Sequence, residues 1–189
     1  YLPDVDIALE EIETLLRNSE NKAVALGEIG LDYYYDDVPR EIQKKWFKEQ
    51  LELAVKVAKP VIIHSREAAS DTMEIMKEYQ GKLGGIIHCF SYSKECADFF
   101  VKCGYYLGIG GVVTFSNAKK LKEVAEYAPL SQIVLETDCP YLAPVPFRGK
   151  RNDSSKLRYV AEELASIKQM SVEEVIRITN ENGKKLYGI

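Results

Sequence analysis

The sequence predicts an α/β fold that corresponds to about the last five βα units of a TIM-type (β/α)8 barrel. Short apolar runs alternate with helical patterns along the whole chain of 189 residues. Each run is continuously apolar, as is typical of parallel strands that are buried on both faces. The runs are spaced roughly as in a barrel, where one unit averages about 30 residues. An open, doubly wound sheet could also hold five parallel strands, but the spacing favours the barrel.

The first elements can be assigned from their apolar patterns and their boundaries. Apolar residues set among acidic ones predict a helix over 7–18, and a strand over 23–27 follows it. Pro39 stands where a proline opens the first turn of a helix, and apolar positions extend this helix to about residue 58. The next elements are strands at 60–63, 84–88, 105–109 and 132–136, separated by helices near 67–79, 93–103 and 117–127.

The end of the chain predicts an irregular loop and two closing helices. The loop over 139–153 is rich in proline, and the last helix begins at Ser171, which forms a capping box with Glu174. No linker or low-complexity tract divides the chain. We therefore expect residues 1–189 to form a single domain.

The composition excludes several classes of protein. The net charge is −4, so binding to a polyanion would need a local basic patch or bound cations. No apolar run approaches the roughly 20 residues of a membrane span, and we expect no membrane partner. The four cysteines form no Cys-x-x-Cys pair. This argues against a zinc knuckle or a thioredoxin motif and predicts reduced thiols in the cytoplasm.

Metal-ligand types stand at the ends of four apolar runs. Glu28, His64, His88 and Asp138 each lie directly after such a run. A closed α/β barrel carries its chemistry at the carboxyl ends of its strands. Both histidines of the chain take this position, each preceded by two isoleucines, so their imidazoles are expected to converge. Imidazole with carboxylate suits Zn²⁺, Mn²⁺ or Fe²⁺, with Mg²⁺ where carboxylates and waters dominate. The sequence therefore predicts a metal-dependent hydrolytic site.

Basic and aromatic residues are expected at the rim of this site. Arg66 follows His64 by two residues, where a guanidinium could hold a phosphate or simply lie exposed without a role. The segment 146–152, which contains Arg148, is locally basic on an acidic protein. It could grip a phosphate backbone or be a solvated charge run. Tyr33 begins a run of three tyrosines that could stack on bases, although at least one is expected to pack into the rim.

Two further features lie beside the candidate ligands. Glu136 and Asp138 are two residues apart on one predicted strand and point the same way. Glu136 either orients a histidine or aspartate ligand or forms a buried ion pair with a neighbouring arginine or lysine, and the pattern leaves both open. Gly108, Gly110 and Gly111 lack the spacing of a dinucleotide-binding loop, and close packing of backbone in the site explains them.

Five motifs resemble those of the TatD family of metal-dependent deoxyribonucleases. They are Gly-Glu-Ile-Gly-Leu-Asp-Tyr at 27–33, Pro-Val-Ile-Ile-His-Ser-Arg at 60–66, Ile-Ile-His-Cys-Phe at 86–90, Glu-Thr-Asp-Cys-Pro-Tyr-Leu at 136–142 and Arg-Gly-Lys-Arg-Asn at 148–152. The match covers essentially the whole chain. It implies a TIM barrel related to the amidohydrolases, which binds divalent metal ions and hydrolyses phosphodiester bonds, commonly in DNA.

The resemblance also implies a role for each site residue. It makes Glu28 the carboxylate shared between two divalent ions (Mg²⁺, Mn²⁺ or Zn²⁺) and places His64 and His88 on the second ion. It makes Asp138 a ligand of the first ion that helps to activate the attacking water. Two such ions polarise the phosphate and stabilise the attacking and leaving oxygens. The expected contacts to the DNA substrate come from Arg66, Arg148, Tyr33 and Asn152.

Two departures from the family pattern concern the ends of the match. Family members begin with a His-x-His pair on the first strand, and this chain has neither that pair nor the first three strands. Residues 1–3 resemble the stretch just after the third strand. Because a five-strand piece alone would expose two sheet edges, we expect the chain to be part of a longer protein or to pair with another copy or fragment. The family's Glu-Pro after the Arg-Asn is replaced by Asp153-Ser154.

Two other functions remain open. One is an amidohydrolase-like hydrolase of amide, ester or lactone bonds. The basic segment 148–158 and the absence of a strand-end lysine favour the nuclease. The other is a truncated, catalytically silent metal-binding module, which the missing His-x-His pair supports. Turnover of small esters and plasmid DNA separates the first from the nuclease, and alanine at Glu28 and Asp138 tests the second.

Overall fold

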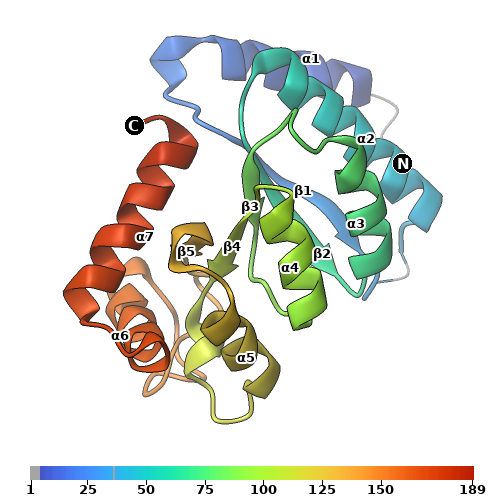
Figure 1. The fold of residues 1–189 in the computed structure, drawn as a ribbon. Coiled ribbons are helices and arrows are strands. Elements are labelled where there is room, and N and C mark those ends of the chain that lie inside the picture. Colours follow the sequence, from blue (N-terminus) through green and yellow to red (C-terminus); the bar gives the residue numbers. More distant parts are fainter. Residues whose placement is uncertain (1–4, 36) are drawn as a thin grey trace. The chain divides into compact units, whose positions relative to one another are not determined.

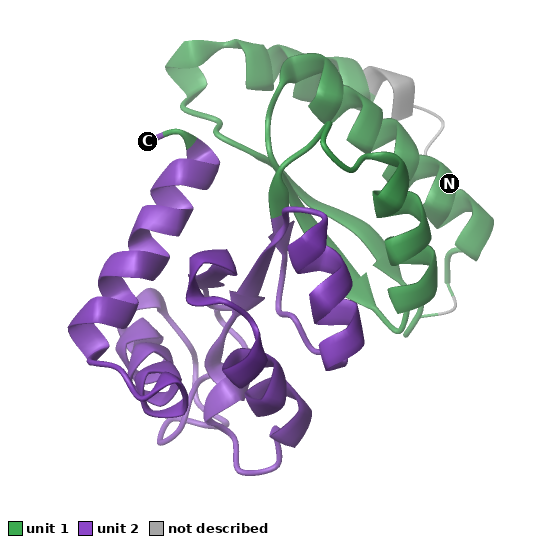
Figure 2. Cartoon of the chain, in the orientation of Figure 1, with its two compact units in different colours: residues 1–85, 188 green, residues 86–187, 189 purple. Residues whose placement is uncertain are grey.

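The computed structural model describes residues 5–35 and 37–189. The chain forms two compact units (Figure 2), where unit 1 is residues 1–85 with 188 and unit 2 is residues 86–187 with 189. The boundary falls within the stretch for which the sequence predicts a single domain.

The helices and strands alternate along the chain, as the sequence predicts (Figure 1). The described elements of unit 1 are α1 (Val5–Arg17), the 3₁₀ helix η1 (Ser19–Asn21), β1 (Leu26–Asp32), α2 (Arg40–Val57), β2 (Val61–Arg66) and α3 (Ala69–Glu78). The elements that follow are β3 (Gly85–Ile87, whose first residue belongs to unit 1), α4 (Lys94–Lys102), β4 (Tyr106–Ile109), η2 (Gly111–Thr114), α5 (Lys119–Tyr127), η3 (Leu130–Gln132), β5 (Ile133–Leu135), η4 (Ser154–Lys156), α6 (Leu157–Lys168) and α7 (Val172–Tyr187).

Strands β1 and β2 form the parallel pair of unit 1. Gly30 lies opposite His64, and Asp32 lies opposite Arg66. Successive side chains of a strand point to opposite faces. His64 and Arg66 therefore share one face of β2, and Asp32 is on the same face of the neighbouring strand.

The opposite face of this pair is the core of unit 1. Ile29 and Leu31 on β1 are buried there, as are Val61 and Ile63 on β2. Helix α2 packs against β1. Its buried side chains are Phe47, Leu51, Leu53 and Ala54. Burying each large side chain of this kind stabilises the unit by about 1.5–3 kcal/mol, so the core fixes which face of the pair stays accessible.

Strands β3, β4 and β5 of unit 2 pair in parallel, in chain order. Ile86, Tyr106 and Val134, one from each strand, form a buried apolar cluster. Leu186 and Tyr187 at the end of α7 pack against it. The last helix thus closes one face of these strands.

A buried amide also joins α7 to β5. The Nδ2 atom of Asn182 donates hydrogen bonds to the backbone oxygens of Leu130 (2.8 Å) and Ile133 (2.7 Å). Asn182 is only 7% exposed, and a buried polar group is stable when its hydrogen bonds are made. These bonds hold the start of β5, the strand that leads to Glu136 and Asp138.

The predicted first strand is wrong in its bounds. The sequence places it at 23–27, whereas β1 runs over Leu26–Asp32. The continuous apolar run ends early, but the backbone stays extended, with Leu26, Ile29 and Leu31 buried and the residues between them partly exposed or exposed. Glu28 therefore lies inside β1, and His64 lies inside β2, rather than just beyond the strands.

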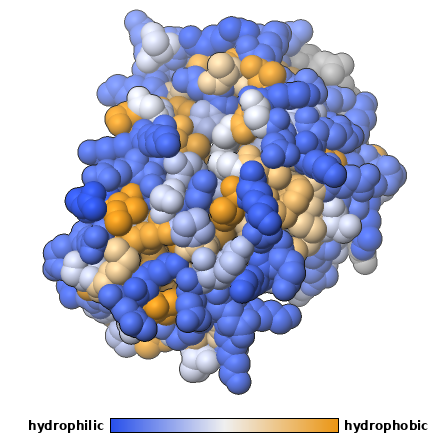
Figure 3. All heavy atoms as spheres, in the orientation of Figure 1, coloured by the Kyte–Doolittle hydropathy of each residue, from blue (hydrophilic) through white to orange (hydrophobic). Residues whose placement is uncertain are grey.

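No helix among the described residues is both long enough and apolar enough to cross a membrane. On the face in Figure 3, most of the surface is hydrophilic, and the apolar side chains appear in separate patches.

Candidate metal centre

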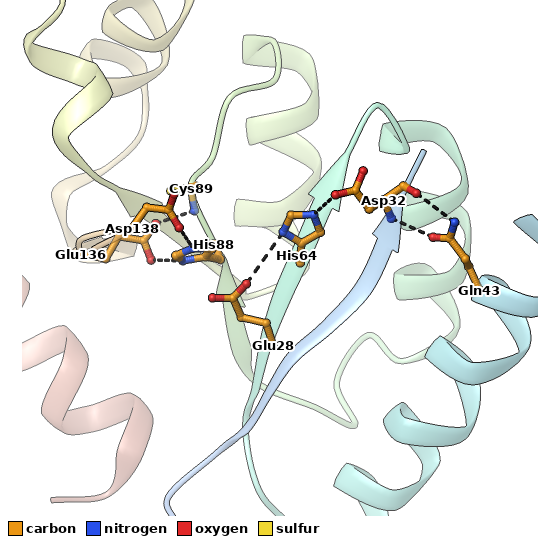
Figure 4. A network of polar contacts seen from close by, with 8 residues as sticks. All are labelled: Glu28, Asp32, Gln43, His64, His88, Cys89, Glu136 and Asp138. Carbon is orange, nitrogen blue, oxygen red and sulfur yellow. Dashed lines mark hydrogen bonds and ion pairs between the residues drawn. The ribbon is translucent and has the colours of Figure 1, made fainter. Parts of the chain in front are cut away.

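The first candidate cluster lies in unit 1 around His64. The His64 Nε2 atom lies 2.9 Å from an Asp32 carboxylate oxygen, and its Nδ1 atom faces a Glu28 oxygen at 3.8 Å (Figure 4). An ionised carboxylate only accepts hydrogen bonds, so the bond to Asp32 is donated by the imidazole. We call Glu28, Asp32 and His64 the His64 cluster.

Asp32 is itself held from both sides. The Gln43 side chain on α2 accepts a hydrogen bond from the Asp32 backbone N–H and donates one to its carbonyl, both at 2.9 Å (Figure 4). The second carboxylate oxygen of Asp32 accepts the backbone N–H of Tyr34 at 3.0 Å. These bonds fix the carboxylate that orients the imidazole of His64.

The second candidate cluster lies in unit 2 around His88. The His88 Nδ1 atom lies 2.8 Å from a Glu136 oxygen, and its Nε2 atom faces an Asp138 oxygen at 3.4 Å (Figure 4). The other Glu136 oxygen accepts the backbone N–H of Cys89. We call His88, Cys89, Glu136 and Asp138 the His88 cluster. Of the two roles left open for Glu136, the structure shows the one that orients a histidine.

The electrostatics of the His88 cluster favour a charged imidazole while no metal ion is bound. Hydrogen bonds to Cys89 and to Glu136 raise the pKa of His88 to about 11, against the opposing effect of its burial. Burial raises the pKa of the Cys89 thiol. An ion that binds the imidazole has to displace a proton.

The two clusters share one construction. In each, a carboxylate holds one imidazole nitrogen, while the other nitrogen faces a second carboxylate, either Glu28 or Asp138. Metal-binding histidines are typically supported by a carboxylate in this way. Two ligand atoms about 2.1 Å from a tetrahedral zinc ion lie roughly 3.4 Å apart, which is close to the separations of 3.8 Å and 3.4 Å found here. The residues therefore fit divalent metal ions.

A second possible ligand set in unit 2 fits less well. One atom each of His88, Cys89 and Glu136 lie within 4.8 Å of one another. Both Glu136 oxygens, however, already accept hydrogen bonds, and the raised pKa of Cys89 disfavours the thiolate that binds metals. The Nε2 side of His88, toward Asp138, is the better place for an ion.

The two predicted phosphate-binding arginines are exposed, and each lies on an aromatic ring. The Arg66 Cζ atom is 3.7 Å from the centre of the Tyr34 ring, and the Arg148 Cζ atom is 4.4 Å from that of Phe115. A stacked guanidinium keeps its N–H donors at the edge of its plane, outside the ring contact. Arg148 also lines a surface pocket of about 510 Å³ together with Tyr141.

Two other predicted substrate-binding residues have positions inside the fold. Asn152 is 2% exposed, donates to the Tyr141 carbonyl at 2.8 Å and accepts the Asp153 backbone N–H at 3.0 Å. It therefore holds the loop from within rather than at the exposed rim. Tyr33 is buried and donates its hydroxyl to Asp71 at 2.6 Å. It matches the expectation that one of the tyrosines packs into the rim.

The Tyr33–Asp71 bond should make stability depend on pH. The hydrogen bond from Tyr33 and the nearby Lys44 lower the pKa of Asp71. A depressed carboxyl pKa adds stability above the unfolded-state value of about 3.9, and this is lost as the pH falls through the lower folded-state value. We expect Asp71→Asn to be less stable than the wild type at pH 6 in urea unfolding, with a difference that narrows below about pH 4. Tyr33→Phe should show the same trend, and a constant difference down to pH 3 would contradict this account.

The sequence pattern missed Asp32 and Gln43. Asp32 stands in the motif at 27–33, but its role could not be predicted, because its partner His64 is 32 residues away along the chain. The parallel register that sets Gly30 opposite His64 brings the two side chains together. Gln43 gave no signal, since a glutamine on a helix is common and the sequence does not show that its side chain reaches the backbone of Asp32.

Comparisons with known proteins identify similar metal-dependent hydrolases. The family model described as TatD related DNase matches residues 3–188. The uncharacterized metal-dependent hydrolase YabD of Bacillus subtilis (strain 168) is 46% identical over 187 residues, which are 98% of this chain and 73% of YabD. The uncharacterized metal-dependent hydrolase YcfH of Escherichia coli (strain K12) is 41% identical over 181 residues, which are 95% of this chain and 68% of YcfH.

The fold agrees as well. The crystal structure of YjjV, a TatD homolog from Escherichia coli K12, matches with a TM-score of 0.91 and 33% identity, covering 97% of this chain and 71% of that one. The likeness confirms the predicted α/β fold of the TIM-barrel type, with five parallel strands in the described residues. The chain therefore belongs to the TatD-related DNase family of metal-dependent hydrolases.

Proposed function

We propose that this protein uses divalent metal ions to hydrolyse phosphodiester bonds in DNA. The observation that carries the proposal is the construction shared by the His64 and His88 clusters, in which a supported imidazole faces a second carboxylate. The description of its family as DNases supports DNA as the proposed substrate.

The proposed ligands are Glu28, His64, His88 and Asp138. Each cluster offers one imidazole nitrogen and one carboxylate to an ion. Two ions are proposed, the number that the family resemblance implies. The donor types suit Zn²⁺ and Mn²⁺, and Mg²⁺ where water completes the shell.

The chain's own residues then have separate tasks in hydrolysis. When bound, the ions polarise the phosphate and lower the pKa of a bound water. Asp138 accepts the proton of the attacking water. Asp32 and Glu136 keep the two imidazoles in place, so that the ligand nitrogens need no reorganisation during the reaction.

Substrate contacts are proposed for Arg66 and Arg148. Both guanidiniums are exposed, and their edges can donate two parallel hydrogen bonds to a phosphate. The protein carries a net charge of −4, so these local cations and the bound metal ions would have to attract DNA against the overall charge. Tyr33 and Asn152 contribute indirectly, since they hold the loops in shape.

The support that Glu136 gives to His88 can be tested at Gly108. A Cβ atom at Gly108 would lie 2.5 Å from the carboxyl carbon of Glu136, so Gly108→Ala has to push Glu136 away from His88. Losing such a supporting carboxylate typically weakens metal binding by about 10–100-fold. A competition titration with a chromophoric chelator measures this. Gly183→Ala on α7, where nothing lies within 4 Å, is the matched control and should bind metal normally.

The proposed activity is tested by adding metal back. The purified protein is stripped with EDTA and then given Mn²⁺, Mg²⁺ or Zn²⁺, with plasmid DNA, a linear oligonucleotide and a panel of small esters as substrates. We expect the DNA to be cleaved only with metal ion added. Turnover of the esters without DNA cleavage would overturn the nuclease in favour of an amidohydrolase-like enzyme. Unchanged activity in Glu28→Ala and Asp138→Ala would support the silent module.

A further inference from the structure

We propose that Tyr34 and Arg66 form a stacking platform for an unpaired nucleobase beside the His64 cluster. This inference deepens the proposed DNA hydrolysis and rests on it for the identity of the substrate.

The platform is an exposed surface made of two planar groups. The Arg66 guanidinium carbon lies 3.7 Å above the centre of the Tyr34 ring, which is close to van der Waals contact. Tyr34 is 54% exposed, and Arg66 is exposed as well. Tyr35, 56% exposed, meets Tyr34 edge to face with ring centres 4.9 Å apart.

The platform is tied to the candidate metal ligands through Asp32. One oxygen of the Asp32 carboxylate accepts a hydrogen bond from the His64 imidazole, and the other accepts one from the backbone N–H of Tyr34. Arg66 follows His64 by two residues on β2, so both side chains are on the same face of the strand. A nucleotide whose base lies on the platform would therefore have its phosphate near the His64 cluster.

An unpaired base is the ligand that this chemistry fits. Bases that are splayed out of a helix stack on tyrosine rings and on arginine planes. The edge of the Arg66 guanidinium carries N–H donors for the adjoining phosphate, so one residue can bind both parts of a nucleotide. A base inside a duplex is stacked and paired, and reaching it would cost the energy of extruding it. The platform therefore requires a base that is already unpaired.

The first test measures binding without catalysis. A single-stranded oligonucleotide carrying 2-aminopurine is titrated with protein in EDTA, and fluorescence quenching reports stacking of that base. We expect quenching with the wild type and with Tyr34→Trp, which keeps a stacking ring. We expect Tyr34→Ala to lose the quenching and to bind roughly 5- to 150-fold more weakly, the range measured for removing one base-stacking aromatic residue. Equal quenching and affinity in wild type and Tyr34→Ala would overturn the platform.

The matched control is Tyr127→Ala. Tyr127 is 40% exposed and also carries a cation on its ring, with the Lys94 Nζ atom 4.4 Å from the ring centre. It belongs to unit 2 and to neither cluster. Its loss should leave binding and quenching unchanged, and an equal loss in Tyr127→Ala and Tyr34→Ala would show a general surface effect and contradict the platform.

The second test separates the platform from the nuclease. The cleavage of a normal oligonucleotide and of one with abasic sites is compared, with Mn²⁺ present. We expect Tyr34→Ala to slow cleavage of the normal strand and to leave that of the abasic strand unchanged. Equal effects on both strands would overturn the platform while the nuclease stands. If no DNA is cleaved but 2-aminopurine is still quenched in a Tyr34-dependent way, the nuclease fails and the platform stands.

Discussion

Asp138→Asn is expected to lower metal-dependent DNA cleavage by about 10²–10⁴-fold, the usual cost of losing a group that transfers a proton in the reaction. The asparagine has nearly the same shape and can still accept a hydrogen bond from His88. It cannot take a proton from water and is a weaker metal ligand. Because Asp138 is partly exposed on a loop after β5, the fold should remain intact.

The measurement is the initial rate of oligonucleotide cleavage at saturating Mn²⁺, with metal affinity determined in parallel. Asp98→Asn on α4 serves as the matched control. It weakens exposed bonds from Lys102 and Tyr127, which contribute little to stability, and should keep the wild-type rate. A wild-type rate in Asp138→Asn would remove Asp138 from the mechanism, and an equal loss in both variants would point to a general defect.

Gly30→Ala is expected to destabilise the protein by about 2–6 kcal/mol, from backbone strain together with overpacking. Gly30 has a φ of +136°, a conformation that residues with side chains rarely adopt. A Cβ atom there would overlap the carbonyl oxygen of His64 and lie 3.2 Å from its carbonyl carbon. Strands β1 and β2 would have to move apart at the residue that carries the imidazole.

Urea unfolding of the metal-free protein checks this value. Gly81→Ala is the control, since Gly81 also has a positive φ, +75°, but no atom lies within 4 Å of the added Cβ. Gly81→Ala adds the backbone strain of a side chain at positive φ without a steric clash. Its loss of unfolding free energy should therefore be clearly smaller than that of Gly30→Ala. If the two variants lose the same unfolding free energy, the close approach of β1 to His64 does not contribute to the loss in Gly30→Ala.

The strands of unit 2 could be predicted from the sequence because they obey a simple rule. Strands buried on both faces are apolar throughout, and β3, β4 and β5 lie within or almost within the predicted runs. Strand β1 breaks this rule, because its second face carries Glu28 and Asp32 instead of apolar residues. The apolar pattern therefore predicted that the strand ends where the apolar run ends.

The site was predictable as a set of residue types and not as a set of contacts. The ends of the apolar runs pointed to His64 and His88 because few other polar residues stand there. Which carboxylate supports each imidazole depends on strand register and side-chain reach, which a single sequence does not contain. Asp32 and Glu136 therefore acquired their roles only from the structure. The assignment of Glu28 and Asp138 as ligands remains a prediction.

Glu136 starts at the end of β5 and reaches His88 at the end of β3, and the strand between them is β4. Its side chain crosses over Gly108, where a single methyl group would fill the space that the carboxylate occupies. The side chains at positions 108 and 136 thus compete for one volume. Across related chains the two positions should covary. Wherever a residue larger than glycine stands at position 108, we expect a residue other than glutamate at position 136.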